Sequence, residues 1–305
     1  MTAGATQAGG CAWERQDSDF PSRGLRCSAW LYRPEGVAQP PLVIMAHGFG
    51  AEKGFGLPAY AERFAAAGLA VLVFDYRCFG SSEGQPRNWV SPRRHLEDWE
   101  AAIEHAKALE GIDGSRIALW GTSFSGGHVV VVASRHPELR AIVAQVPLAD
   151  GRAALATVRP GMAVKMIFAG LLDLLSMVGG RPPHTLPIVG EPDSFAVLNT
   201  EGCWEGIRAL IPKDSPWQNA CPARVVFSLA SYRPTKYAAR VRCPALVMPA
   251  ERDRLIPYRS VEKEAAKMPK AELVPLACEH FDPYLGERFE RVVRIQRDFL
   301  SARLA

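Results

Sequence analysis

The chain of 305 residues contains no run of 18 apolar residues, and its first residues lack the charged-then-apolar pattern of a signal peptide. We therefore expect no membrane-spanning segment and no membrane partner. Its seven cysteines are dispersed and include no C-x-x-C pair, which argues against structural zinc and against a disulfide framework. These absences predict a protein of the reducing cytoplasm.

A strong excess of one charge is also lacking. The formal net charge is only +4, and the basic residues form no long run, so we expect no nucleic-acid partner. The hydrophobic content of 48% and the charged content of 22% are typical of a globular protein. The length allows one domain with an insertion, or two small domains.

A strand–turn–helix pattern around Ser123 is the most informative feature that is present. The apolar segment 117–120 predicts a short buried strand, and the segment 124–135 predicts a helix directly after a tight turn. A serine on such a turn exposes its hydroxyl, while the helix N-terminus behind it presents unpaired backbone N–H groups to an anion. The segment therefore predicts a nucleophilic serine.

The register of this turn needs a choice between two serines. In the usual pattern G-x-S-x-G, small residues flank the nucleophile because strand and helix close on each other. Ser123 has Gly121 two residues before it and Ser125 two residues after it, whereas Ser125 has Gly127 after it and Ser123 before it. We choose Ser123, since the strand ends at Trp120 and Ser125 would already lie in the first helical turn.

Buried strands alternate with helical segments along most of the chain. Strands are expected at 25–32, 42–46, 70–74, 117–120, 141–146, 245–249 and 271–276, and helices at 57–67, 91–109, 124–135, 258–268 and 287–302. This alternation predicts an α/β fold, with a mostly parallel twisted sheet and helices on both faces.

The alternation stops in the middle of the chain, where buried strands disappear and prolines accumulate. We expect a mainly helical cap insertion at 149–235 and a core formed by 22–148 and 236–305. Residues 1–21 are expected to be an N-terminal extension that frays or forms at most an edge strand.

Two loops near the end of the chain supply the partners that a nucleophilic serine needs. Asp253 comes shortly after the strand at 245–249, and His280 comes shortly after the strand at 271–276. Because ligands bind at the carboxyl ends of parallel strands, we expect both side chains at that edge of the sheet. We therefore predict Ser123, Asp253 and His280 as a catalytic triad.

Alternatives exist for the acid and for the base. Asp150 follows another strand and is the second choice for the acid, while Asp282 follows the histidine too closely to orient it. Glu251 is expected to face solvent. His47 also ends a strand, but its His-Gly-Phe-Gly context favours a role in shaping a turn.

Each residue type in this triad has a physical task. A serine hydroxyl becomes a good nucleophile when a neighbouring imidazole takes its proton, and neutral imidazole suits this because its ordinary pKa of about 6.5 lies near neutral pH. The carboxylate holds the ring in the required tautomer and stabilises the imidazolium that forms.

Two backbone N–H groups are expected to form an oxyanion hole. The glycines around Phe49 let the chain turn an N–H toward the reacting carbonyl, and the second donor would be the N–H of Phe124, directly after the nucleophile. The segment 75–82, rich in glycine and serine, is expected to pack beside the site, with substrate contact as its alternative role.

Together these motifs resemble the α/β-hydrolase superfamily. The motifs are H-G-F-G at 47–50, D-Y-R-x-x-G-x-S at 75–82, the serine turn, E-R-D at 251–253 and H-F-D-x-Y at 280–284. The serine turn and the last motif are most similar to a branch of dienelactone-hydrolase and polyketide thiohydrolase or transferase-like members. The chain order Ser, Asp, His is the one found on this scaffold. The resemblance covers about 22–150 and 235–303, and the serine at position 125 departs from its usual pattern.

The resemblance implies hydrolysis of an ester, thioester or related acyl bond of a small-molecule substrate, without a cofactor or metal. Alternatives are an acyltransferase or thioesterase for carrier- or CoA-linked, polyketide-like chains, and a non-catalytic binding protein on the same fold. The Leu, Met and Pro content of the cap, together with Trp204 and Trp217, indicates either a largely apolar or aromatic acyl substrate or a core of the cap itself; we favour the core for any single one of these residues. An oligomer formed through the cap is left open. Cys278 is expected to be a buried thiol rather than a reactive one.

Overall fold

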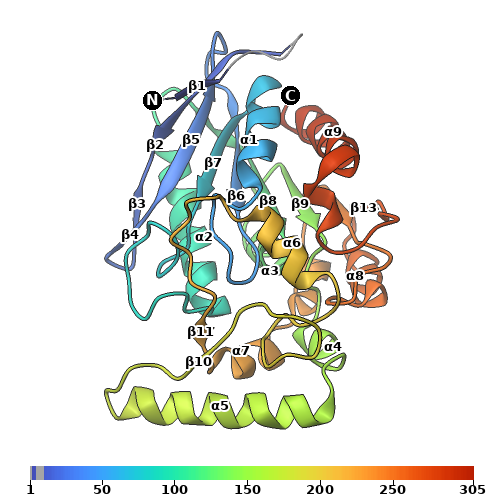
Figure 1. Ribbon diagram of the computed structural model, residues 1–305. Coiled ribbons are helices and arrows are strands. Elements are labelled where there is room, and N and C mark those ends of the chain that lie inside the picture. Colours follow the sequence, from blue (N-terminus) through green and yellow to red (C-terminus); the bar gives the residue numbers. More distant parts are fainter. Residues whose placement is uncertain (1, 5–9) are drawn as a thin grey trace.

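One large sheet forms the centre of the computed structural model, which describes residues 2–4 and 10–305 (Figure 1). Within these residues, nine strands are ordered β1-β2-β5-β7-β6-β8-β9-β12-β13. Their bounds are β1 Thr2–Gly4, β2 Trp13–Asp17, β5 Ala29–Pro34, β6 Pro41–Ala46, β7 Ala70–Phe74, β8 Asp113–Thr122, β9 Ala141–Gln145, β12 Ala245–Met248 and β13 Ala271–Leu273. A separate hairpin pairs β3 (Phe20–Ser22) with β4 (Leu25–Cys27).

The strands from β7 to β13 in this order are parallel, and β1, β2 and β5 add an antiparallel edge. Every residue of β6, β7 and β9 is buried, as expected for strands that are covered on both faces. The expected N-terminal extension, 1–21, contributes to this sheet: β2 pairs with β5 over five residues. The core sheet therefore begins before residue 22. The sequence does not reveal this strand, because the alternation of Trp13–Asp17 is too weak.

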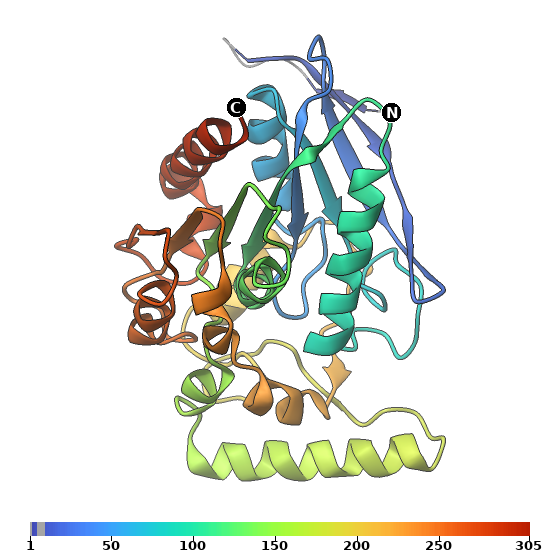
Figure 2. The same ribbon diagram turned by 180° about the vertical axis from the view of Figure 1, so that it is seen from behind.

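Helices cover both faces of the sheet (Figures 1 and 2). Side chains of α1 and α9 pack on one face, and side chains of α2, α3 and α8 pack on the other. The helices span α1 Leu57–Ala66, α2 Pro92–Lys107, α3 Phe124–Ala133, α8 Tyr258–Ala265 and α9 Gly286–Leu304. Alternate residues of β6 divide between the two cores: Ile44 faces one and Val43 faces the other.

The insertion lies between β9 and β12 and is mainly helical. Its elements are α4 Gly151–Leu155, α5 Pro160–Val178, β10 Thr185–Leu186, α6 Cys203–Leu210, β11 Cys221–Pro222 and α7 Val225–Ser231, followed by the short helices η1 Pro234–Lys236 and η2 Ala238–Arg240. Another short helix, η3 Asp282–Tyr284, precedes α9. The helix α5 runs along the end of the molecule opposite both termini (Figures 1 and 2).

The predicted fold class is confirmed: the chain forms a mostly parallel α/β sheet with helices on both faces and a helical insertion. By length and composition, α5 is also apolar enough to cross a membrane. The sequence of α5 is not one uninterrupted apolar run, because Lys165 and Asp173 lie within it.

Candidate active site

Ser123 stands on a strained turn between β8 and α3. Its backbone angles, φ 54° and ψ −119°, lie in a region that L-residues rarely occupy. The turn is packed tightly, because a Cβ on Gly121 would overlap the carbonyl oxygen of Ser125. These contacts explain why small residues flank the turn and why its first position is a glycine.

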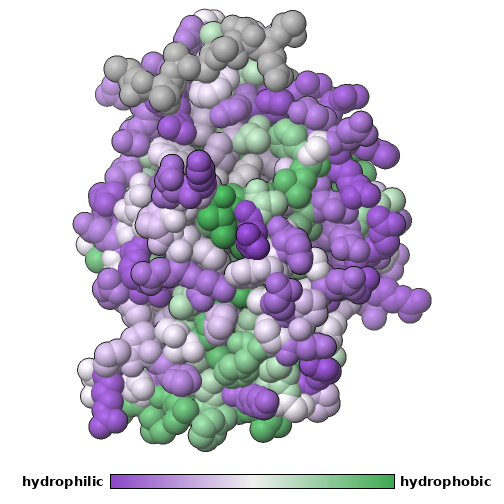
Figure 3. All heavy atoms as spheres, in the orientation of Figure 1, coloured by the Kyte–Doolittle hydropathy of each residue, from purple (hydrophilic) through white to green (hydrophobic). Residues whose placement is uncertain are grey.

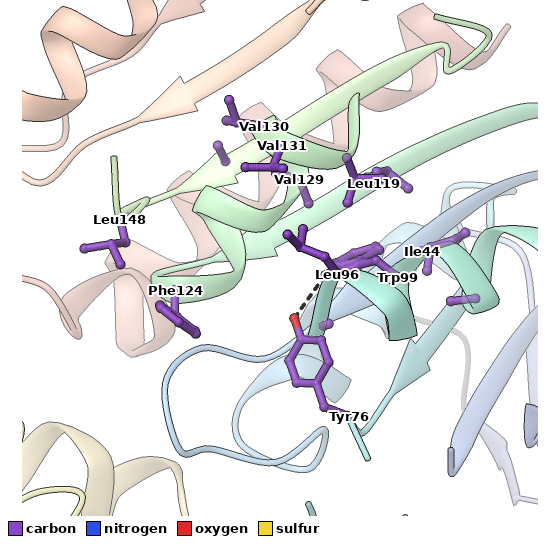
Figure 4. Close-up of a cluster of buried hydrophobic side chains, with 14 of the residues drawn as sticks. Ile44, Tyr76, Leu96, Trp99, Leu119, Phe124, Val129, Val130, Val131 and Leu148 are labelled. Carbon is purple, nitrogen blue, oxygen red and sulfur yellow. Dashed lines mark hydrogen bonds between the residues drawn. The ribbon is translucent and has the colours of Figure 1, made fainter. Parts of the chain in front are cut away.

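Ser125 lies within the first turn of α3 and is fully buried. Its hydroxyl is hydrogen-bonded to the Tyr76 hydroxyl at 2.8 Å, and Tyr76 also accepts from the indole N–H of Trp99 at 3.0 Å (Figure 4). A serine at this position therefore keeps the flank small and gives a buried tyrosine a partner. Ser123, in contrast, is partly exposed and lines a cavity.

The structure brings Ser123, His280 and Asp253 together in one hydrogen-bonded chain. His280 lies 27 residues after Asp253, and its Nδ1 is 2.6 Å from Asp253 Oδ2. Its Nε2 is 3.0 Å from the Oγ of Ser123. With Nδ1–H donating to the carboxylate, Nε2 is left to accept the serine hydroxyl proton.

Asp253 is fixed independently of the histidine. Its Oδ1 accepts the backbone N–H groups of Leu255 at 2.8 Å and Ile256 at 2.9 Å. The side chains of Asp253 and His280 are 2% and 6% exposed, so water competes little for their hydrogen bond. A rigid, dry carboxylate of this kind can hold an imidazole in one orientation.

The alternative acids lie elsewhere. Asp150 caps α4 and is 2.8 Å from Arg233 in an ion pair. Asp282 accepts the N–H of Glu279 and the Arg288 guanidinium, so it shapes the loop that carries the histidine. Glu251 is exposed, as expected.

The loop after β6 lies directly against the nucleophile. A Cβ on Gly48 would lie 3.0 Å from the Cβ of Ser123, so this approach requires glycine. The rings of Phe49 and Phe124 contact each other with centroids 5.7 Å apart. Among the described residues, the N–H groups of Phe49 and Phe124 donate no hydrogen bond, and both residues line a cavity beside Ser123.

The cap holds this loop in place, which the sequence did not indicate. The indole N–H of Trp217 donates to the carbonyl of Gly50 at 2.8 Å, and its ring packs against Phe55. Trp204 packs in a small core of the cap, as favoured from the sequence. Neither tryptophan lines the cavities at Ser123, and only the fold could reveal the contact of Trp217 with the loop.

His47 is buried beneath the same loop. Its Nδ1 is 3.0 Å from the Gly48 carbonyl, and its ring packs on Tyr76 and Phe79. Burial lowers its pKa, so the ring is neutral, and its Nε2 lies 3.7 Å from Asp75, beyond hydrogen-bond distance. The segment 75–82 lines neither cavity at Ser123 among the residues described, in agreement with a packing role.

A buried polar cluster lies behind the nucleophile. His95 stacks on Tyr76 with centroids 4.0 Å apart, and its Nδ1 is 3.2 Å from Nε2 of His128. The Nδ1 of His128 is 2.6 Å from the Tyr232 hydroxyl. Burial lowers the pKa of His128 to about 3 and that of His95 well below its ordinary value. Both rings are therefore neutral.

Two cavities meet at Ser123. The larger, of about 90 Å³, extends under the cap, and its apolar wall includes Leu155, Met166 and Val226. The smaller, of about 30 Å³, lies on the side of His280 and is bounded by Phe281. Cys278 lies near this side but is buried, and burial raises the pKa of its thiol to about 11.

Comparison with known proteins agrees with this geometry. The family model described as serine aminopeptidase, S33, matches residues 39–276. The chain belongs to this family. It is an α/β-hydrolase, and the family resemblance inferred from its motifs is confirmed.

Relatives of this hydrolase extend over nearly its whole length. It is 39% identical over 285 residues to the quorum-quenching protein AidA of Acinetobacter baumannii, covering 93% of this chain and 94% of that protein. It is 28% identical to the thiohydrolase aneE of Aspergillus aculeatus, covering 92% and 91%. The crystal structure of the α/β-hydrolase GrgF from Penicillium superposes with a TM-score of 0.83 at 26% identity, covering 95% and 99%.

Proposed function

We propose that this hydrolase cleaves an ester, a thioester or a related acyl bond of a small, largely apolar substrate through an acyl-enzyme intermediate. The observation that carries the proposal is the chain of two hydrogen bonds from Asp253 through His280 to Ser123, 2.6 and 3.0 Å long. Hydroxyl, imidazole and carboxylate in this order supply a nucleophile, a base and the group that orients the base.

The reaction follows from this arrangement. As Oγ of Ser123 bonds to the acyl carbon, its proton passes to Nε2 of His280, and Asp253 stabilises the imidazolium. The carbonyl oxygen becomes an oxyanion that accepts the N–H groups of Phe49 and Phe124. The imidazolium then gives its proton to the departing oxygen or sulfur, which leaves Ser123 acylated. A water molecule bonds to the acyl carbon as His280 takes its proton. Return of this proton to the Oγ of Ser123 releases the acid and restores the enzyme.

The direction of proton transfer indicates which cavity holds the leaving group and which holds the acyl group. The leaving group must receive its proton from His280, so it lies on the histidine side of Ser123. The smaller cavity is lined by His280, whereas the larger one is not. The acyl group therefore extends into the larger cavity, under α4, α5 and α7.

The lining of the larger cavity supports an apolar acyl group. Among its described lining residues none is charged, and the aliphatic ones predominate. In an aminopeptidase this cavity would hold the N-terminal residue of a peptide, whose charged amine needs an acidic side chain beside it. The described lining of this cavity contains no acidic side chain. An uncharged, apolar acyl chain fits it best.

The exit on the histidine side favours an uncharged leaving group. A surface groove of about 330 Å³ continues beyond His280. Among the described residues, its lining carries four carboxylates and one guanidinium. The carboxylates are those of Glu201, Glu205, Glu279 and Asp282, and the guanidinium is that of Arg254. Like charges repel, so this groove disfavours the phosphates of CoA and favours a simple alcohol or thiol.

An acyltransferase or thioesterase acting on carrier-linked, polyketide-like chains is the second candidate. It is supported by relatives named thiohydrolase aneE and polyketide transferase grgF, which are 28% and 27% identical to this chain over more than nine-tenths of it. The same triad would serve both: a thioesterase keeps water as the acyl acceptor, whereas an acyltransferase uses an alcohol in its place. The seven free thiols support the proposed cytoplasmic location.

A fluorophosphonate probe tests the nucleophile. We expect it to label the wild type and Ser125→Ala but not Ser123→Ala. Labelling that survives in Ser123→Ala and disappears in Ser125→Ala would overturn the assignment. Circular dichroism of each variant checks that the fold is kept.

The substrate class is tested with matched acyl donors. We expect p-nitrophenyl butyrate and hexanoate to be hydrolysed with higher kcat/KM than butyryl-CoA and hexanoyl-CoA. Product analysis with and without added methanol or hexanol separates the two candidates. Ester product that dominates over free acid at millimolar alcohol would favour the transferase.

A further inference from the structure

The outer face of α5 is apolar and uncovered. Seven of its large side chains are exposed by 47% or more among the residues described: Val164, Ile167, Phe168, Leu171, Leu175, Met177 and Val178. They form the green surface along the lower end of the molecule in Figure 3. Contiguous apolar patches on monomers rarely exceed a few hundred square ångströms, so seven large exposed side chains on one helix are unusual for a monomer.

The one acidic residue of α5, Asp173, is buried although the helix lies at the surface. Asp173 is fully buried and points into the cap, where its carboxylate accepts two N–H groups of the Arg224 guanidinium at 2.6 and 2.8 Å. It also accepts the backbone N–H groups of Arg224 and His184. This buried fork fixes the rotation of α5, so its apolar face cannot turn inward.

The spacing of the exposed residues identifies the kind of partner. Val164, Phe168, Leu171, Leu175 and Val178 follow one another at intervals of four, three, four and three. This is the a/d repeat by which one helix packs along another. A lipid surface requires only a broad apolar face with basic residues beside it, and Lys165 within α5 and Arg159 and Arg181 at its ends would serve as such residues. A lipid surface does not require the a/d spacing, however, whereas a second helix does.

We propose that α5 is the interface of a homodimer, in which it packs antiparallel to the same helix of a second copy. A two-fold axis beside Leu171 would place Val164 against the partner's Val178 and Leu175 against the partner's Ile167, which is also exposed. Lys165 near the helix N-terminus then lies toward the partner helix's carbonyl end, whose dipole is negative. A stable interface of standard size buries about 800 Å² per partner, so the contact must cover all seven exposed side chains and not the repeat alone.

Sedimentation velocity from 1 to 50 µM tests the association. We expect the wild type to have twice the 33.3 kDa mass of the chain. The variant Phe168→Glu/Leu171→Glu should be a monomer with unchanged circular dichroism. Leu285→Glu, which changes another leucine of similar exposure outside the cap, should stay dimeric. A wild type that is monomeric throughout this range overturns the proposal.

Disulfide trapping tests the orientation without relying on glutamate variants. Cys11→Ser is the background, because Cys11 is the free cysteine that is not buried. In it, Leu171→Cys should cross-link to itself on oxidation. Val164→Cys should link only when mixed with Val178→Cys. Self-linking of all three would indicate a parallel pair, and linking of none would overturn the interface.

A membrane is the competing occupant. Vesicles of phosphatidylcholine with one-third phosphatidylglycerol are sedimented with the wild type and with Phe168→Glu/Leu171→Glu. We expect neither protein to sediment with the vesicles. Binding of a monomeric wild type that the double variant loses would assign the face to lipid and refute the dimer.

Discussion

Lys53 and Asp75 form a buried ion pair beneath the loop that carries Phe49, with 2.8 Å between Nζ and Oδ2. The backbone N–H of Lys53 donates to the other oxygen of Asp75 at 2.6 Å, and its ammonium also donates to Ser28. This ion pair thus joins the loop after β6, the loop after β7 and the residue before β5. The loop expected to supply an oxyanion donor is therefore anchored from below by this pair and from above by Trp217.

Lys53→Met should destabilise the fold and slow the reaction. It leaves the Asp75 carboxylate buried without its cation, which costs about 3–5 kcal/mol. Urea unfolding measures this loss, and kcat should fall more than KM rises because the loop loses its anchor. Glu290→Gln removes one partner of the exposed Arg63–Glu290 pair and should change stability by about 1 kcal/mol or less. Equal effects of the two substitutions would contradict the anchoring role.

Asp253→Asn should lower kcat by about 10³–10⁴-fold with little change in KM, because the amide no longer selects the reactive tautomer of His280. Initial rates on p-nitrophenyl butyrate measure the effect. Asp150→Asn and Asp282→Asn are matched controls and should lose less than about tenfold, since neither carboxylate is hydrogen-bonded to His280. A larger loss in either control would reassign the acid.

Ala154→Phe should shorten the acyl group that the enzyme accepts. Ala154 lines the cavity under the cap, and a phenyl group there occupies space that the acyl chain needs. We expect kcat/KM for p-nitrophenyl hexanoate to fall at least about tenfold, with the acetate ester nearly unaffected. The exposed Ala156, two residues further along, does not line the cavity, so Ala156→Phe should change neither value. Equal losses for both esters would place the acyl group elsewhere.

The residues of the site that the sequence could predict are those marked by local patterns. Ser123, Asp253 and His280 each follow a short apolar strand, and parallel strands bring such positions to one edge of the sheet. The contacts that support them depend on residues far apart in sequence, such as Trp217 with Gly50 and Ser125 with Tyr76. No periodicity encodes these pairs, so only the folded chain reveals them.

The same limit explains what was missed at one end of the sheet and in the cap. The first four residues of β2 are all half-buried, so the strand shows no clear alternation. The apolar composition of the cap favours a buried core for the side chains of α5. Composition does not tell which face of a helix is covered. The exposure of its large apolar side chains and the burial of Asp173 show that the apolar face of α5 points outward.

The neutral His128 should make the fold sensitive to acid. Burial lowers its pKa to about 3, while the unfolded chain has an ordinary histidine near 6.5. Between these values the unfolded state binds a proton that the folded state does not, so stability falls as the pH falls through this window. The contribution is about 1.4 kcal/mol per pH unit. Urea unfolding from pH 6.5 to 4.5 should therefore show a shallower slope for His128→Gln than for the wild type. The exposed His184→Gln should keep the wild-type slope, and an unchanged slope in His128→Gln would show that this ring gains its proton in the folded state.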